Sequence, residues 1–182
     1  MLQEGKYILF SEEQLAEKVT QLAQQISADY AGKELLVIGI LKGAMVFMAD
    51  LVRKITVPTY YDFMAVSSYG SSTTTSGAVR LIKDLDYSIE NRHVLIVEDI
   101  VDTGLTLNYL LDNLLSRNPA SLSLCALLDK PSKRQKQVAI NYSGFSVPDE
   151  FVVGYGLDYD EKFRNLPYIM VLDKSKIPGG GQ

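Results

Sequence analysis

Short apolar segments rich in β-branched residues alternate along this chain with stretches that carry apolar residues at helical spacing. Strands that alternate with helices predict an α/β fold, in which a mainly parallel sheet is flanked by helices. We expect strands over residues 35–40, 59–66, 93–97, 122–128, 151–154 and 168–172, and helices over residues 12–30, 44–54 and 106–116.

The length and the distribution of residue types favour one domain. The chain has 182 residues, which is enough for one sizeable core, and we find no internal repeat and no compositional break. We therefore expect a single domain over residues 1–182. Residues 67–77 are almost all small and polar, which predicts a mobile loop, and residues 178–182 predict a frayed tail.

The net charge and the distribution of apolar residues argue against nucleic acid and membranes as partners. The formal net charge of -4 argues against a general affinity for nucleic acid or an anionic membrane. No apolar run approaches the length of a membrane span, and no signal peptide is visible. The single cysteine, Cys125, lies in an apolar run, which predicts a buried thiol. We expect a cytoplasmic protein with no membrane and no nucleic-acid partner.

Residues 94–106, with the sequence VLIVEDIVDTGLT, carry the strongest functional signal. An apolar strand runs directly into two carboxylates, Glu98 and Asp99, and a third, Asp102, follows before the next helix. Ligands of open α/β sheets bind at the carboxyl ends of the strands. This segment therefore predicts a polar ligand site at the edge of the sheet.

The turn over residues 102–106 offers backbone N–H groups, two hydroxyls and a helix N-terminus, which together form a phosphate cradle. The acidic pair beside it could accept hydrogen bonds from a sugar diol, either directly or through the water shell of a metal. A phosphate site next to a diol site indicates a ribose 5-phosphate. The alternative is an ordinary turn between strand and helix with an Asp or Thr cap. The cradle comprises Thr103, Gly104, Leu105 and Thr106.

This segment resembles the phosphoribosyl pyrophosphate motif of the type I phosphoribosyltransferases, and the resemblance extends over roughly the whole chain. Three more segments narrow it to the hypoxanthine-guanine branch of that family. They are residues 39–43 (GILKG), residues 67–70 (SSYG), and Asp129-Lys130 together with residues 151–164 (FVVGYGLDYDEKFR).

Lys42 and Gly43 follow a predicted strand and precede a helix, which suggests a second anion site. The resemblance implies that this loop binds pyrophosphate and contains a non-proline cis peptide, here Leu41–Lys42. It further implies that Arg164 binds pyrophosphate and that Asp158 binds a second metal ion.

The resemblance also implies a purine pocket. Lys130 would donate to the 6-oxo group, and because an ammonium group cannot accept a hydrogen bond, it favours 6-oxo purines over adenine. Phe151 would stack on the purine, and the backbone around Val152 would read its edge. Tyr155 and Gly156 would lie near the base. The remaining basic residues of this region, Lys133, Arg134 and Lys136, are expected to be surface charges.

Taken as a whole, the resemblance implies transfer of phosphoribosyl from phosphoribosyl pyrophosphate to hypoxanthine or guanine, with Mg2+ as cofactor. Glu98 and Asp99 would orient the ribose and the metal shell, directly or through water, and Asp102 would act as general base. Ser68 and Tyr69 would close over the site. The family also implies a homo-oligomer, a dimer or a tetramer.

Two alternatives remain open from the sequence. One is a regulator that binds phosphoribosyl pyrophosphate without turnover, and the other is a phosphoribosyltransferase for another base, such as xanthine. The only histidine, His93, has no role that we can derive, and we expect it to be exposed or capped.

Overall fold

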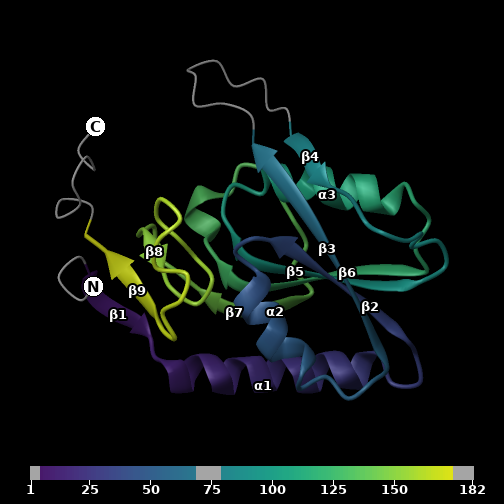
Figure 1. Ribbon diagram of the computed structural model, residues 1–182, viewed down its shortest axis with the longest axis horizontal. Coiled ribbons are helices and arrows are strands. Elements are labelled where there is room, and N and C mark those ends of the chain that lie inside the picture. Colours follow the sequence, from purple (N-terminus) through teal and green to yellow (C-terminus); the bar gives the residue numbers. More distant parts are fainter. Residues whose placement is uncertain (1–4, 69–78, 174–182) are drawn as a thin grey trace.

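The computed structural model describes residues 5–68 and 79–173. Its larger sheet has the strand order β4-β3-β2-β5-β6-β7 (Figure 1). All neighbouring pairs are parallel except β3 and β4, so the expected mainly parallel α/β sheet is confirmed. The strands are β2 (Leu35–Leu41), β3 (Thr59–Ser68), β4 (Val79–Lys83), β5 (His93–Val101), β6 (Ser121–Asp129) and β7 (Tyr142–Ser146).

A smaller antiparallel sheet, which we call the hood, has the order β1-β9-β8. It joins the two ends of the described chain and lies beside the larger sheet (Figure 1). Its own apolar cluster is centred on Val153, Leu166, Met170 and Leu172. The hood strands are β1 (Gly5–Phe10), β8 (Val152–Val153) and β9 (Ile169–Leu172).

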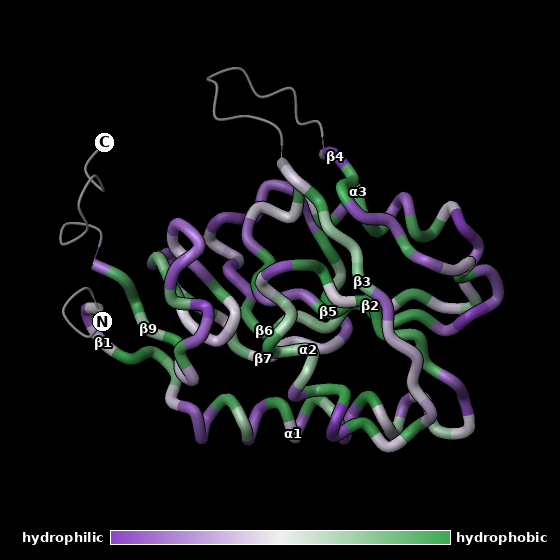
Figure 2. The backbone as a smooth tube through the Cα atoms, in the orientation of Figure 1, coloured by the Kyte–Doolittle hydropathy of each residue, from purple (hydrophilic) through white to green (hydrophobic). Residues whose placement is uncertain are grey.

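Helices cover both faces of the larger sheet because its central strands are apolar on both sides. In β2, Leu35 and Val37 join the cluster that includes α1 and α2, whereas Leu36 and Ile38 join the cluster that includes α3. The hydrophobic colouring of β2, β5 and β6 in Figure 2 follows this double burial. The helices are α1 (Glu12–Asp29), α2 (Met45–Val52), α3 (Leu105–Leu115) and a short 3-10 turn, Pro131–Lys133.

The start of α1 follows from local chemistry. Ser11 is the N-cap, as its position before the amphipathic pattern predicted. The Gln14 N–H donates to Ser11 Oγ at 3.3 Å, and the Ser11 N–H donates to Gln14 Oε1 at 2.9 Å. This reciprocal pair satisfies two N–H groups that the helix itself cannot satisfy.

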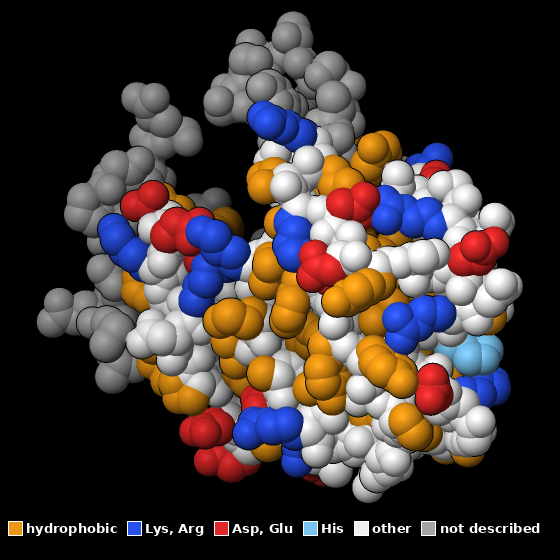
Figure 3. Space-filling model, turned by 45° about the vertical axis from the view of Figure 1, so that its right-hand side comes forward, with side chains coloured by type: hydrophobic (Ala, Val, Ile, Leu, Met, Phe, Trp, Pro, Cys, Tyr) orange, Lys and Arg blue, Asp and Glu red, His pale blue; other side chains and the backbone are white. Residues whose placement is uncertain are grey.

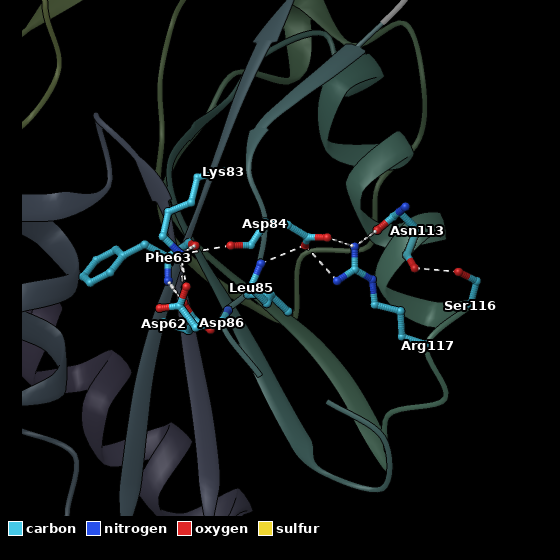
Figure 4. A network of polar contacts seen from close by, with 9 residues as sticks. All are labelled: Asp62, Phe63, Lys83, Asp84, Leu85, Asp86, Asn113, Ser116 and Arg117. Carbon is cyan, nitrogen blue, oxygen red and sulfur yellow. Dashed lines mark hydrogen bonds and ion pairs between the residues drawn. The ribbon is translucent and has the colours of Figure 1, made fainter. Parts of the chain in front are cut away.

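A polar network connects β3, the end of β4 and α3 (Figure 4). The buried Asp62 carboxylate accepts from the Asp86 N–H and from Lys83 Nζ. Arg117, just after α3, donates to both carboxylate oxygens of Asp84 at 2.8 and 2.9 Å. The network therefore fixes α3 against the strand pair at the edge of the sheet.

The sequence also led to expectations about the cysteine and about membrane-spanning helices. Cys125 is fully buried in β6, as predicted, and burial raises the pKa of its thiol. Across residues 5–68 and 79–173, no helix is both long and apolar enough to cross a membrane.

Candidate functional site

The acidic pair lies within β5 and not beyond its end, which corrects the expected strand boundary at residue 97. The strand continues to Val101 because Glu98 and Val101 pair with Ala126 and Asp129 of the neighbouring β6. The Ile100 N–H donates to Asp99 Oδ1 at 2.8 Å. Among the described residues, the buried Glu98 Oε2 has no hydrogen-bond partner.

The pair sits in an environment that disfavours two negative charges. Burial raises the pKa of Glu98 well above its usual range, and the neighbouring Asp99 carboxylate adds to that shift. Burial also raises the pKa of Asp99, against the opposing effect of its hydrogen bonds. The pair thus consists of two adjacent carboxylates with raised pKa values, and one of their oxygens has no hydrogen-bond partner among the described residues. Such a site favours a ligand that is positively charged or that donates hydrogen bonds.

We expect Glu98→Gln to raise the thermal stability of the protein at pH 7–8. Because the folded-state pKa is raised, folded protein retains the Glu98 proton to higher pH than unfolded protein does. The free energy of unfolding therefore falls as the pH rises from the usual pKa of a glutamate towards the raised folded-state pKa, and glutamine removes that loss. Melting temperatures measured from pH 4 to pH 8 should show a gain at neutral pH that shrinks towards pH 4. A variant less stable than wild type at pH 8 would contradict this account.

The turn after β5 leads into α3 with an open helix N-terminus. The N-cap of α3 is Gly104, with φ of 80°, and among the described residues no side chain makes an N-cap hydrogen bond to the helix. The alternative in which Asp102 is the helix cap is therefore wrong. The left-handed backbone at residue 104 suits glycine, and an added β-carbon there would also collide with the Lys136 carbonyl. The Leu105 N–H donates to Thr103 Oγ1 at 3.4 Å, a long bond that an anion bound at this helix N-terminus would replace.

Arg134 braces this turn, so its assignment as a surface charge was wrong. Its side chain is only 9% exposed and forms an ion pair with Asp129. It donates to the Asp102 carbonyl at 3.0 Å and to the Val101 carbonyl at 3.2 Å. The N–H groups of residues 135 and 136 both donate to the Thr103 carbonyl. A segment far along the chain thus fixes the backbone of the phosphate cradle.

Two cavities meet at Asp102. The first, about 230 Å³, is lined by Glu98, Asp102 and the cradle residues Thr103, Gly104 and Thr106, together with apolar residues of β2, β3, β5 and α3. The second, about 510 Å³, is lined by Asp102, Lys130 and Phe151 and reaches the hood. Asp102 therefore lies between a small acidic and cradle-lined space and a larger space with an aromatic wall.

The loop after β2 packs directly on the acidic pair. It contains the expected cis peptide, Leu41–Lys42. A β-carbon added at Gly43 would overlap the Asp99 carboxylate, and one added at Gly156 would overlap the Gly43 carbonyl. Glycine at both positions lets three segments approach closely: the β2 loop, β5 and the chain after β8.

Lys42 and Arg164 meet at a group of acids. Lys42 Nζ lies 2.9 Å from Glu161 Oε2. Arg164 Nη2 lies 2.8 Å from Asp158 Oδ1 and 3.5 Å from Glu161 Oε1, and Arg164 Nη1 donates to the Gly156 carbonyl. Asp158 also accepts from the Glu161 N–H at 2.9 Å. The two cations expected at the pyrophosphate are thus brought close together.

The larger cavity is lined by two of the three residues expected at a purine, Lys130 and Phe151, but not by Val152. Lys130 is buried, with 7% exposure, and donates to the Glu150 carbonyl at 2.8 Å. Phe151 lines the cavity and meets Tyr159 edge to face, with ring centroids 5.6 Å apart. Val152 is buried in β8. A cationic donor and an aromatic ring therefore share one pocket.

Other expected residues are placed differently or lie outside the described chain. The Tyr155 hydroxyl donates to Asp50 in α2, so the Tyr155 side chain points away from the purine pocket. His93 Nδ1 lies 2.8 Å from Ser121 Oγ, which fits a capped histidine. Ser68 ends β3, and Tyr69 lies outside the described residues, as does most of the expected loop over 67–77.

The sequence did not single out several residues that line the larger cavity. Lys6 reaches it from β1, and the Lys133–Asp149 ion pair, 2.9 Å long, lies at its wall. Glu150 provides a carbonyl to Lys130 and a carboxylate 3.8 Å from Lys6. Lys6 belongs to the hood strand β1, far along the chain from the other residues, and no local sequence signal marks its proximity to them.

Comparison with known proteins agrees with this geometry. Residues 8–160 match the phosphoribosyl transferase domain. The chain is 55% identical over 174 residues to a hypoxanthine-guanine phosphoribosyltransferase of Mycobacterium tuberculosis, covering 92% of this chain and 86% of that one. It is 52% identical over 165 residues to the protein of that name from Bacillus subtilis, covering 91% and 92%.

Solved structures give the same result for the fold. A hypoxanthine phosphoribosyltransferase from Staphylococcus aureus superposes with a TM-score of 0.92 at 47% identity, over 96% of this chain and 95% of that one. A hypoxanthine-guanine phosphoribosyltransferase from Bacillus anthracis, with a HEPES molecule in its active site, superposes with a TM-score of 0.89 at 50% identity, over 93% and 100%. The chain belongs to the phosphoribosyltransferase family, and within it to the hypoxanthine-guanine phosphoribosyltransferases.

Proposed function

We propose that this protein transfers phosphoribosyl from phosphoribosyl pyrophosphate to hypoxanthine or guanine and releases pyrophosphate, a purine-salvage reaction. The observation that carries the proposal is the position of Asp102 between two cavities. One cavity has the acids and open N–H groups that suit a ribose 5-phosphate. The other has the cationic donor and aromatic ring that suit a 6-oxo purine.

Phosphoribosyl pyrophosphate would bind across three segments. The N–H groups and hydroxyls of Thr103, Gly104, Leu105 and Thr106 would hold the 5-phosphate at the N-terminus of α3. Glu98 and Asp99 would accept hydrogen bonds from the ribose hydroxyls. On the other side of Asp99, Lys42, Gly43 and Arg164 would bind the pyrophosphate group.

The residues present fit a magnesium ion. Glu98 Oε2 is a buried carboxylate oxygen without a partner among the described residues, and carboxylates supplemented by substrate oxygens are the ligands that Mg2+ prefers. Glu98 and Asp99 would hold one ion, directly or through water, and Asp158 would hold a second. When bound, Mg2+ would neutralise charge on the departing pyrophosphate.

The chain's own residues would then act on the purine and the leaving group. Asp102 would accept the proton from N7 of the purine while the unprotonated ring nitrogen of the same five-membered ring attacks C1 of the ribose and pyrophosphate leaves. Lys42 and Arg164 would stabilise the charge that builds on pyrophosphate as its bond to C1 breaks. Ser68 and Tyr69 would exclude water from the electrophilic ribose.

Lys130 would select the base. Its ammonium group is a donor only, so it pairs with a 6-oxo group and leaves the 6-amino group of adenine unpaired. Its burial and its bond to the Glu150 carbonyl support a fixed orientation. Phe151 would stack on the purine, and the backbone around Val152 would read its edge.

We expect Lys130→Ala to raise the KM for hypoxanthine by about tenfold or more, the usual effect of losing a charged hydrogen bond. The Kd for phosphoribosyl pyrophosphate should stay near the wild-type value, because Lys130 lines only the larger cavity. Lys133→Ala is the matched control, since that exposed lysine lines the same cavity but pairs with Asp149. Equal losses for both substrates would remove Lys130 from the base site.

The reaction itself is tested by mixing the protein with phosphoribosyl pyrophosphate, Mg2+ and each of hypoxanthine, guanine, xanthine and adenine, and measuring nucleotide formation. We expect IMP and GMP, little product from adenine, and loss of activity with a chelator. Binding of phosphoribosyl pyrophosphate without any nucleotide would instead indicate a regulator, and preferred use of xanthine a different base specificity.

We also propose a cytoplasmic homo-oligomer. Large hydrophobic side chains are exposed at Met45, Tyr60 and Tyr61, and Figure 3 shows hydrophobic side chains gathered on one face. Such patches are typical of protein–protein contacts. Sedimentation would distinguish a dimer from a tetramer.

A further inference from the structure

One carboxylate outside the expected set contacts both cations of the proposed pyrophosphate site. Glu161 Oε2 accepts a hydrogen bond from Lys42 Nζ at 2.9 Å, and Glu161 Oε1 lies 3.5 Å from Arg164 Nη2. Carboxylate and phosphate oxygens accept from the same charged donors. Glu161 therefore occupies hydrogen-bonding positions that a pyrophosphate oxygen would use.

The backbone at Glu161 has an uncommon conformation for this residue type. Asp160 and Glu161 are the central residues of a two-residue turn, in which Tyr159 and Lys162 exchange N–H···O bonds of 3.2 and 3.0 Å. Both central residues have positive φ, 51° and 61°. Turns of this kind favour glycine or asparagine at such positions. Glutamate at this position carries a conformational cost, and its side chain contacts Lys42 and Arg164.

Glu161 partly neutralises both cations. Its carboxylate lies 2.9 Å from Lys42 Nζ and 3.5 Å from Arg164 Nη2. An incoming pyrophosphate group must replace these contacts before it gains the full attraction of Lys42 and Arg164.

We propose that Glu161 competes with the pyrophosphate group for Lys42 and Arg164, and thereby weakens pyrophosphate binding and favours its release. This inference rests on the proposed function, in which those two cations bind pyrophosphate. Glu161 touches no reacting atom in this scheme; it acts through Lys42 and Arg164. Because the Lys42 and Glu161 side chains are 66% and 63% exposed, the expected effect is a modest one.

The test is calorimetric titration of the full chain with magnesium pyrophosphate. We expect Glu161→Gln to bind it about two- to fivefold more tightly than wild type, the range of an exposed ion pair. Asp160→Asn is the matched control, since Asp160 lies in the same turn, loses the same charge and pairs with Lys162 at 3.5 Å. It should bind like wild type. Structural damage would weaken binding, so tighter binding separates competition from a structural role.

Lys42→Ala separates this inference from the proposed function. If Lys42→Ala leaves the Kd unchanged, Lys42 does not bind pyrophosphate, and the proposed role of this loop is overturned. If Lys42→Ala weakens binding but Glu161→Gln matches Asp160→Asn or binds less tightly, the site stands and the inference about Glu161 is overturned. In the Lys42→Ala background, the gain from Glu161→Gln should shrink, as expected for coupled residues.

A second variant covers the possibility that glutamine disturbs the turn. Glu161→Gly removes the same carboxylate and suits positive φ better than glutamate does. It should fold at least as stably as wild type and show the same tighter binding. A well-folded Glu161→Gly variant with wild-type affinity would overturn the inference.

Discussion

Asp102→Asn should lower kcat by about 10²–10⁴-fold, the usual contribution of one positioned proton-transfer group. KM for hypoxanthine and for phosphoribosyl pyrophosphate should change much less, because an interaction made only in the transition state leaves ground-state binding alone. Asparagine keeps the shape of the side chain but cannot accept the purine proton. Steady-state kinetics with both substrates measures the split between kcat and KM.

The structure narrows what this substitution can disturb. Asp102 does not cap α3, since the N-cap is Gly104 and no side chain of the described residues makes an N-cap hydrogen bond there. The contact between Asp102 and Arg134 uses the Asp102 carbonyl, which the substitution leaves in place. Asp102 also lines both cavities. A fall in kcat would therefore report on chemistry at the junction and not on a displaced turn.

The matched control is Asp112→Asn, which removes the same charge from an exposed position in α3. It should keep wild-type kcat. Single-turnover measurements establish whether chemistry limits the rate, since slow product release would hide a defect. A near-normal single-turnover rate for Asp102→Asn would return Asp102 to a structural role.

The sequence predicted the centre of the fold well because that part is buried on both sides. Strands β2, β5 and β6 are nearly continuous apolar runs, which is typical of central parallel strands. The boundary of β5 was set too early because Glu98 and Asp99 look like a strand end. Pairing with β6 carries the strand past them, and local composition does not reveal that pairing.

The strands that the sequence did not predict lie at sheet edges or in the hood. β4 and β7 are the two edge strands of the larger sheet, with five residues each, and β1 is an outer strand of the hood. An edge strand pairs on one side only and buries less apolar surface, so its pattern is weak. These short segments are strands because a neighbour pairs with them.

In the candidate site, as in the fold, the sequence predicted some residues and missed others. The sequence marked the residues that follow central strands, such as Lys42, Asp102 and Lys130, because parallel strands end at one edge of the sheet. It did not mark Arg134 or Glu161. The sequence shows that both residues are charged, but it does not show what they contact. Arg134 contacts the Asp102 carbonyl and Glu161 contacts Lys42, and in each pair the two residues are far apart along the chain.

Gly43→Ala should lower kcat/KM by about 100-fold while the protein stays folded. The new β-carbon would overlap the Asp99 carboxylate, so that side chain must move out of its present position. Misplacement of a substrate-positioning group by about 1 Å costs on the order of 100-fold in rate. The melting temperature should change little, because the group in the way is a side chain and not backbone.

Gly144→Ala provides the contrasting control. A β-carbon at Gly144 would meet the Leu127 carbonyl in β6, which is backbone of the central sheet. That variant should lose thermal stability but keep its activity per folded molecule, the reverse of the pattern at Gly43. Melting temperatures and kcat/KM measured on both variants separate damage to the site from damage to the fold.

The comparison with Asp99 decides whether Gly43 acts through that carboxylate. Suppose that the added methyl group of Gly43→Ala harms catalysis only because it displaces the Asp99 carboxylate. In Asp99→Ala that carboxylate is already absent, so the methyl group has nothing left to displace. The double variant should then be no less active than Asp99→Ala alone, because residues that act as a unit are not additive. Losses that multiply in the double variant would show that Gly43 contributes independently, through its own backbone contact with the pyrophosphate group.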